Sequence, residues 1–140
     1  MLSLLVTLVV APAAASADDA SIAAGRSLYL QNCASCHGAG GEGAPNWTKP
    51  DANGELPPPP HDASGHTWRH SDADLQAMIE KGWRDPFNKT TRLTMPAFAS
   101  VLSRAEIADV IGYLKTLWTP EERQYQSELN RSANTNPARQ

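Results

Sequence analysis

Apolar side chains recur at intervals of three and four residues in three stretches of the chain, 20–32, 71–81 and 103–118. This spacing places them on one face of an α-helix, so each stretch is predicted to be helical. The apolar face is widest in the last stretch, where it comprises Ile107, Val110, Ile111, Leu114, Leu117 and Trp118. Since no stretch alternates convincingly between apolar and polar residues, the pattern predicts an all-α domain.

Residues at the ends of these stretches support the helix boundaries. Ser71 is a suitable N-cap for a helix with an acidic first turn, and Gly82 is a suitable C-terminal cap. Ser103 and Glu106 have the spacing of a capping box. A fourth helix is predicted to begin after Thr119, with a proline in its first turn, and to end near residue 130.

Glycine and proline are concentrated between residues 38 and 60, and this segment ends in four consecutive prolines. Such a run favours the extended polyproline II conformation, so the segment is predicted to be a loop. A second loop is predicted over residues 93–100, where Met95 directly precedes Pro96. Because the residue before a proline is biased away from helical geometry, Met95 is expected on an extended strap between two helices.

The N-terminal 17 residues carry no charged side chain and include an apolar run over residues 2–10. Ala15-Ser16-Ala17 matches a small-residue cleavage pattern, so residues 1–17 are predicted to be a signal peptide, although no Lys or Arg precedes the run. The alternative is an uncleaved anchor, but the run is shorter than the ~20 apolar residues that span a bilayer. We therefore expect a periplasmic protein without a transmembrane anchor in its mature form.

The rest of the chain is predicted to hold one small domain over residues 18–119, followed by a C-terminal segment over residues 120–140. This segment is expected to be a short helix with a disordered tail from residue 131, where large apolar side chains are missing. The formal net charge of −3 is mild and argues against a nucleic-acid partner.

Both cysteines of the chain fall within the pentapeptide Cys33-Ala34-Ser35-Cys36-His37. C-x-x-C-H is the pattern that attaches a c-type haem, in which both thiols bind the porphyrin covalently and the histidine is an axial ligand of the iron. A thioredoxin-like dithiol shares the spacing but requires a preceding strand, and a zinc site requires a second close pair of ligands. The sequence meets neither requirement and therefore predicts one covalent haem c.

A six-coordinate haem needs a second axial ligand, and the candidates are Met78, Met95, His61, His66 and His70. Met78 lies on the apolar face of a predicted helix, where a methionine fills the core. Met95 lies on the strap, from which a thioether can reach the free face of the ring. Ligation by His37 and Met95 raises the reduction potential relative to two histidines and leaves no open position on the iron, as an electron carrier requires.

Over residues 20–118 the chain resembles the mono-haem class I cytochromes c. The resemblance is carried by residues 25–29, the C-x-x-C-H pentapeptide, and residues 43–46, 95–98 and 107–117. It implies a small all-α fold wrapped around one haem, in which the first and last helices cross closely at Gly25 and Gly112. It also implies that the carbonyl of Pro45 accepts a hydrogen bond from His37.

Residues 61–70 resemble a subgroup of short bacterial c-type cytochromes that carry a Gly-His-Thr-Trp stretch after a proline-rich loop. Trp68, Arg69 or Trp83 could hydrogen-bond the haem propionates. Alternatively, Trp68 and Trp83 could pack against the edge of the ring.

The function expected from these features is that of a soluble periplasmic one-electron carrier, not an enzyme, so no catalytic residue is predicted. Its partners would be redox protein donors and acceptors, and the chain would be a monomer or a complex subunit. Three alternatives stay open. They are a haem subunit of a larger oxidoreductase, a haem enzyme or sensor with a displaceable Met95, and accessory copper binding by His61, His66 and His70.

Overall fold

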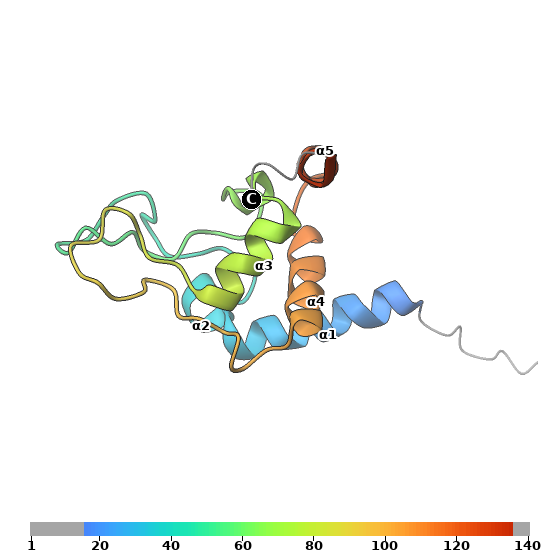
Figure 1. Ribbon diagram of the computed structural model, residues 1–140, viewed down its shortest axis with the longest axis horizontal. Helices are drawn as coiled ribbons and strands as arrows, with labels where there is room; N and C mark the ends of the chain where they lie inside the picture. The colour runs from blue at the N-terminus through green and yellow to red at the C-terminus, as the bar shows by residue number, and fades with distance from the viewer. Residues whose placement is uncertain (1–15, 136–140) are drawn as a thin grey trace, which may run out of the picture.

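The computed structural model describes residues 16–135, which form five α-helices and one turn of 3-10 helix. The elements are α1 (Ala17–Asn32), α2 (Ala34–His37), η1 (Thr67–Arg69), α3 (Asp72–Lys81), α4 (Arg104–Lys115) and α5 (Pro120–Thr135). In Figure 1, α1 crosses α4, α3 lies beside α4, and two long loops extend together from the same side of the helices. The predicted all-α fold is confirmed, because residues 16–135 contain one isolated β-bridge and no strand.

Three of the helices begin with a capping box. Ser16, Ser71 and Ser103 each accept a hydrogen bond from the backbone N–H three residues later, and the acidic side chain at that position bonds back to the serine. The predicted starts of α3 and α4 are therefore confirmed. α5 begins in a similar way, since Thr119 and Glu122 exchange side-chain to backbone hydrogen bonds of 3.2 and 2.8 Å.

The predicted signal peptide, residues 1–17, lies outside the described residues except for its last two positions. Ser16 is the N-cap of α1 and Ala17 is its first residue, so this helix begins earlier than the predicted start at residue 20. Cleavage after Ala17 would remove the capping serine. It would leave Asp18 and Asp19, whose negative charges still stabilise the N-terminus of a helix.

The hydrophobic core lies where α1 crosses α4. Tyr29 of α1 and Ile107 of α4 are fully buried there, and Leu75 of α3 joins them. At the crossing, a Cβ on Gly25 would collide with the backbone carbonyl of Asp109, so only glycine allows this approach. The cost of a mid-helix glycine, about 1 kcal/mol relative to alanine, is therefore offset by close packing of two helices.

Gly112 does not mark the crossing, contrary to what the family resemblance implies. A Cβ added to Gly112 would meet no atom within 4 Å. Gly112 instead borders an open depression on the surface, which is also lined by Ile22, Lys115 and Arg123. The close approach is therefore made by a glycine of α1 alone, against the backbone of α4 around Asp109.

α5 is longer than the sequence predicts. Residues 131–135 are helical, so the prediction of disorder is wrong for them, while residues 136–140 lie outside the described part of the chain. Figure 1 shows this helix end-on, beyond the end of α4. Disorder is predicted here from the lack of large apolar side chains. That composition does not reveal the contacts of Gln126 and Asn130 with Asp72, which hold the preceding part of the helix against the domain.

A polar hub on Asp72, at the start of α3, attaches α5 to the domain. Gln126 of α5 is only 2% exposed and donates a hydrogen bond of 2.6 Å to Asp72 Oδ1, while Lys115 of α4 donates one of 2.7 Å to Oδ2. Asn130 accepts a hydrogen bond of 2.7 Å from the backbone N–H of Asp72. Burial raises the pKa of Asp72, but the hydrogen bonds from Lys115 and Gln126 outweigh it and hold that pKa below its usual value.

The two glycines provide a matched pair of substitutions. We expect Gly25→Ala to destabilise the holoprotein by about 2 kcal/mol, because the added methyl group overpacks the helix crossing. Gly112→Ala should stabilise it by roughly 0.5–1 kcal/mol, since alanine is the better helix former and the site has room. Denaturant unfolding of both variants measures these changes. Equal effects of the two substitutions would contradict the assigned crossing.

Candidate haem site

The two cysteines lie on either side of the first turn after α1. Cys33 is both the C-cap of α1 and the N-cap of α2, and its backbone N–H donates a hydrogen bond of 2.8 Å to Tyr29. Cys36 lies on α2 and is exposed, and both thiols are free. Burial raises the pKa of Cys33 to about 11, and the neighbouring Cys36 thiol contributes in the same direction. Both sulfur atoms are thus free to form thioether bonds.

His37 is fixed by the proline run, and by a different proline from the one that the resemblance implies. Its Nδ1 donates a hydrogen bond of 2.9 Å to the carbonyl of Pro59, whereas Pro45 is exposed, so the assignment to Pro45 is wrong. With the proton on Nδ1, the lone pair of Nε2 is free to bind a metal ion. Burial lowers the pKa of His37, and the bond to Pro59 opposes that effect.

Gly43 explains why the last prolines of the run, and not Pro45, reach the histidine. The backbone of Gly43 has a φ of 68° and donates a hydrogen bond of 2.7 Å to the carbonyl of His37. A Cβ at this position would lie 2.7 Å from the carbonyl carbon of Pro59. The proline run therefore folds back directly over Gly43, and its carbonyl oxygens serve as acceptors although prolines have no N–H to donate.

His61 is a neighbour of His37 and was not recognised as such from the sequence. The two imidazole rings stack with centroids 4.1 Å apart. His61 Nδ1 lies 2.8 Å from Thr67 Oγ1, whose hydroxyl donates a hydrogen bond of 3.3 Å to the carbonyl of Pro60. Burial, with smaller contributions from His37 and His66, lowers the pKa of His61 to about 3. The one available signal was its position directly after the proline run.

The three histidines that the copper hypothesis groups do not converge. His61 faces His37, while His66 and His70 contact each other edge to face with ring centroids 5.5 Å apart. Among residues 16–135, no cluster of three or more His, Cys, Asp or Glu side chains could hold a metal ion. Met78, the other methionine considered from the sequence, lies on α3 and lines a shallow surface depression beside Trp83.

Met95 lies on an extended strap, as its sequence predicts. Its backbone forms an antiparallel bridge with Trp83, with hydrogen bonds of 2.9 and 3.0 Å, and its half-buried side chain packs against the core. Gly82 has a φ of 74°, and a Cβ there would lie 2.6 Å from the carbonyl oxygen of Met95. The end of α3 therefore holds the methionine strap in close backbone contact.

The two tryptophans differ in their surroundings. Trp68 is half-buried, packs against the core, and lies edge to face with Tyr125 of α5 and beneath the guanidinium of Arg69. Trp83 is 46% exposed and contributes its backbone to the bridge with Met95. The contacts of both tryptophans with haem propionates or with the ring edge stay predictions.

The residues present fit a covalent haem. Two free thiols are spaced as in C-x-x-C-H, His37 has an unprotonated Nε2, and Met95 offers a thioether on a constrained strap. Two buried side-chain nitrogens, His66 Nδ1 and Trp68 Nε1, lack a hydrogen-bond partner among residues 16–135. The N–H of Trp68 thus needs an acceptor, and a propionate carboxylate is one.

These observations define a class of protein, a small all-α domain built to carry a covalently attached haem. The family model described as Cytochrome c matches residues 22–118, and the chain belongs to the cytochrome c family as a mono-haem class I cytochrome c. It binds haem c through Cys33 and Cys36 and is an electron-transfer protein, either a carrier or a haem subunit.

Curated relatives are similar over the same part of the chain. The cbb3-type cytochrome c oxidase subunit FixP of Azorhizobium caulinodans is 34% identical over 95 residues, which are 68% of this chain and 29% of that protein. The cbb3-type cytochrome c oxidase subunit CcoP of Azospirillum brasilense is 31% identical over 102 residues, or 69% of this chain and 31% of that protein. The chain thus spans about three tenths of the length of these relatives. No solved structure matches it significantly.

The bond between His37 and Pro59 can be tested through Gly43. Gly43→Ala is strained at positive φ and forces the proline run away, so the acceptor of the Nδ1 proton is weakened. A less basic imidazole stabilises ferric iron less, so we expect the reduction potential of the holoprotein to rise. Gly40→Ala is the control, because its Cβ would meet only the flexible end of Glu42, at 3.2 Å. An unchanged potential in Gly43→Ala would contradict this role of the proline run.

Proposed function

We propose that this cytochrome is a soluble periplasmic one-electron carrier whose haem is ligated axially by His37 and Met95. The observation that carries the proposal is the backbone bridge between Met95 and Trp83, which holds a thioether on a strap against the core. When bound, the haem supplies an iron centre that gains and loses one electron reversibly. The chain supplies the two ligands and the surroundings that hold them.

His37 and Met95 have complementary roles in this proposal. The Pro59 carbonyl orients the imidazole and increases its basicity, while the thioether is a weak, neutral donor that favours ferrous iron. If His37 and Met95 both held the iron, they would leave no position for a substrate, and the chain would need to rearrange little when the haem gains or loses an electron. Cys36 is exposed, so the attachment edge of the ring would lie close to the surface where a redox partner can approach.

The comparisons favour a second candidate, a haem subunit of a larger oxidase. The relatives described above are named as subunits of cbb3-type cytochrome c oxidases. In residues 16–135 we find no helix with the length and apolar character needed to cross a membrane. A cytochrome c domain can pass an electron in either setting, so the two candidates differ in the partner and not in the chemistry of the site.

Substitution of Met95 tests the ligation. In Met95→Ala holoprotein we expect loss of the weak far-red sulfur-to-iron band, a fall in reduction potential, and carbon monoxide binding to the ferrous form that the parent protein lacks. Met78→Ala is the matched control and should leave all three unchanged. Rapid carbon monoxide binding by the unmodified protein would favour the enzyme or sensor alternative.

Fractionation tests the export and the free state of the carrier. Expressed with its native N-terminus in a host with haem-maturation machinery, the holoprotein should be recovered from the periplasm as a monomer that begins at Asp18. Intact-mass measurement and size-exclusion chromatography provide the readouts. Retention of residues 1–17 would instead support the uncleaved anchor, and isolation from its native membranes within a larger complex would support the subunit candidate.

A further inference from the structure

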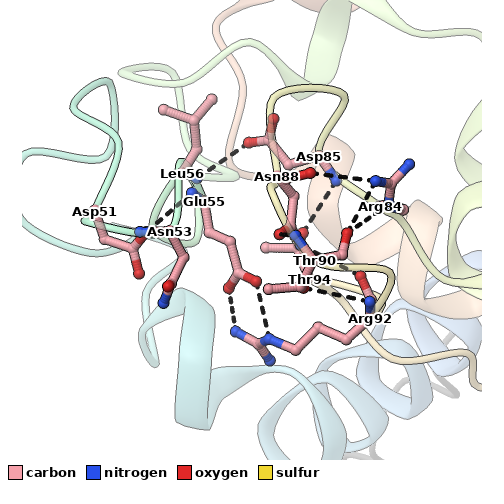
Figure 2. Close-up of polar contacts among 10 residues, drawn as sticks. All are labelled: Asp51, Asn53, Glu55, Leu56, Arg84, Asp85, Asn88, Thr90, Arg92 and Thr94. Atoms are coloured by element: carbon pink, nitrogen blue, oxygen red, sulfur yellow. Dashed lines mark hydrogen bonds and ion pairs between the residues drawn. The ribbon is translucent and has the colours of Figure 1, made fainter.

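A buried polar network joins two loops that are distant in the sequence, residues 51–56 and residues 84–94 (Figure 2). Glu55 lies at its centre and is only 5% exposed. Arg92 Nε donates a hydrogen bond of 2.9 Å to Glu55 Oε1, and Arg92 Nη2 donates a second one to Oε2. Two parallel bonds of this kind constrain both the distance and the orientation of the paired groups.

Asp85 makes a second connection between the same loops. It is buried, and its Oδ2 accepts a hydrogen bond of 3.0 Å from the backbone N–H of Leu56, while Oδ1 accepts one of 2.8 Å from Phe87. The backbone N–H of Asp85 donates to Thr94 Oγ1 at 3.0 Å. Asp85 therefore connects the loop over residues 51–56, the turn at Phe87 and Thr94, which immediately precedes Met95.

The loop that leads to Met95 is also braced from within. Asn88 is buried and accepts a hydrogen bond of 2.7 Å from the backbone N–H of Thr90, while its amide group donates one of 3.3 Å to the carbonyl of Arg92. Arg84 donates to the backbone carbonyls of Asn88 and Thr90. These bonds take the place of regular secondary structure, which the loop lacks, and they restrain its end at residues 92–94.

From these contacts we infer that Glu55 and Arg92 form a clip that positions Met95 as an axial ligand. On one side, the Met95 backbone is bridged to Trp83 at the end of α3. On the other side, Arg92 pairs directly with Glu55, and Thr94 bonds to Asp85, whose carboxylate accepts a hydrogen bond from Leu56 in the loop that carries Glu55. The inference rests on the His37 and Met95 ligation proposed above.

The clip matters because a thioether is a weak ligand. When the bond between the Met95 sulfur and the iron opens, the sulfur rebinds readily only if the strap stays in place. Contacts that restrain the strap therefore increase the fraction of time that the sulfur is bound. A carboxylate buried in the loop interior keeps its charge at low cost only while a cation is paired with it. Loss of either partner should therefore loosen the strap more than loss of an equivalent exposed ion pair.

The experiment measures how fast cyanide replaces the sixth ligand of the ferric holoprotein, since this rate reports detachment of the native ligand. Arg92→Gln breaks the clip. Arg104→Gln is the matched control, because Arg104 pairs with Glu80 at 3.1 Å between α4 and α3. Both arginines are largely exposed, with side chains 64% and 80% accessible, so neither substitution removes a buried group of its own.

We expect cyanide binding to become roughly tenfold faster in Arg92→Gln, equivalent to about 1.4 kcal/mol in the barrier, and to change less than about twofold in Arg104→Gln. Glu55→Gln should match Arg92→Gln. The double variant should be no faster than either single variant, because both remove the same interaction. In the double variant no buried carboxylate is left without a cation. The double variant therefore still tests the clip if Arg92→Gln alone folds poorly. Denaturant unfolding then separates a local loosening from a general loss of stability.

The outcomes distinguish the clip from the ligation on which it rests. If Met95→Ala binds cyanide rapidly but Arg92→Gln, Glu55→Gln and the double variant resemble the parent protein, the ligation stands and the clip is refuted. If the two single variants accelerate binding but their effects add fully in the double variant, the residues act independently and the clip is also refuted. If Met95→Ala leaves the far-red band and the cyanide rate unchanged, the proposed ligation itself fails.

Discussion

The hydrogen bond from His37 Nδ1 to the carbonyl of Pro59 is the interaction on which the rest of the site depends. It sets the tautomer of the imidazole, so that Nε2 is available to a metal ion, and it joins the short helix of the C-x-x-C-H motif to a loop more than twenty residues away, with their atoms separated by 2.9 Å. The stacking of His61 on His37 and the bond from Trp118 Nε1 to the His61 carbonyl at 2.9 Å extend the same connection to the segment between α4 and α5. One ring is thereby oriented by the proline run and by the helical core together.

The other side of the site is built without regular secondary structure. The strap that carries Met95 has a backbone bridge to Trp83, and further backbone hydrogen bonds join Phe98 and Ala99 to α3. Buried polar side chains of the two long loops brace the chain that leads to it (Figure 2). Buried carboxylates and amides are costly when unpaired, and Glu55, Asp85 and Asn88 all have hydrogen-bond partners here. Apolar side chains hold α1, α3 and α4 together, whereas hydrogen bonds and an ion pair between polar side chains hold the two loops together.

α5 lies beyond the residues that match the cytochrome c family and is nevertheless integrated into the domain. Asp72 links it to α3 and α4, and Tyr125 contacts the ring of Trp68 edge to face. This helix therefore lies beside the half-buried tryptophan that is a candidate for contact with the haem. The relatives that match the chain are named as subunits of cbb3-type cytochrome c oxidases, and the match covers about three tenths of their length.

Local patterns in the sequence determined the haem attachment residues, the helices with wide apolar faces and the capping roles of Ser71 and Ser103, because covalent spacing, helical period and capping act within a few residues. Only the tertiary structure decided that Pro59 and not Pro45 accepts the bond from His37, that Gly25 alone makes the helix crossing, and that residues 131–135 stay helical. The pairing of Glu55 with Arg92 belongs to the same group. Each of these features depends on contacts between segments that are far apart in the sequence. Local patterns do not identify such contacts, because they reflect only interactions between residues a few positions apart.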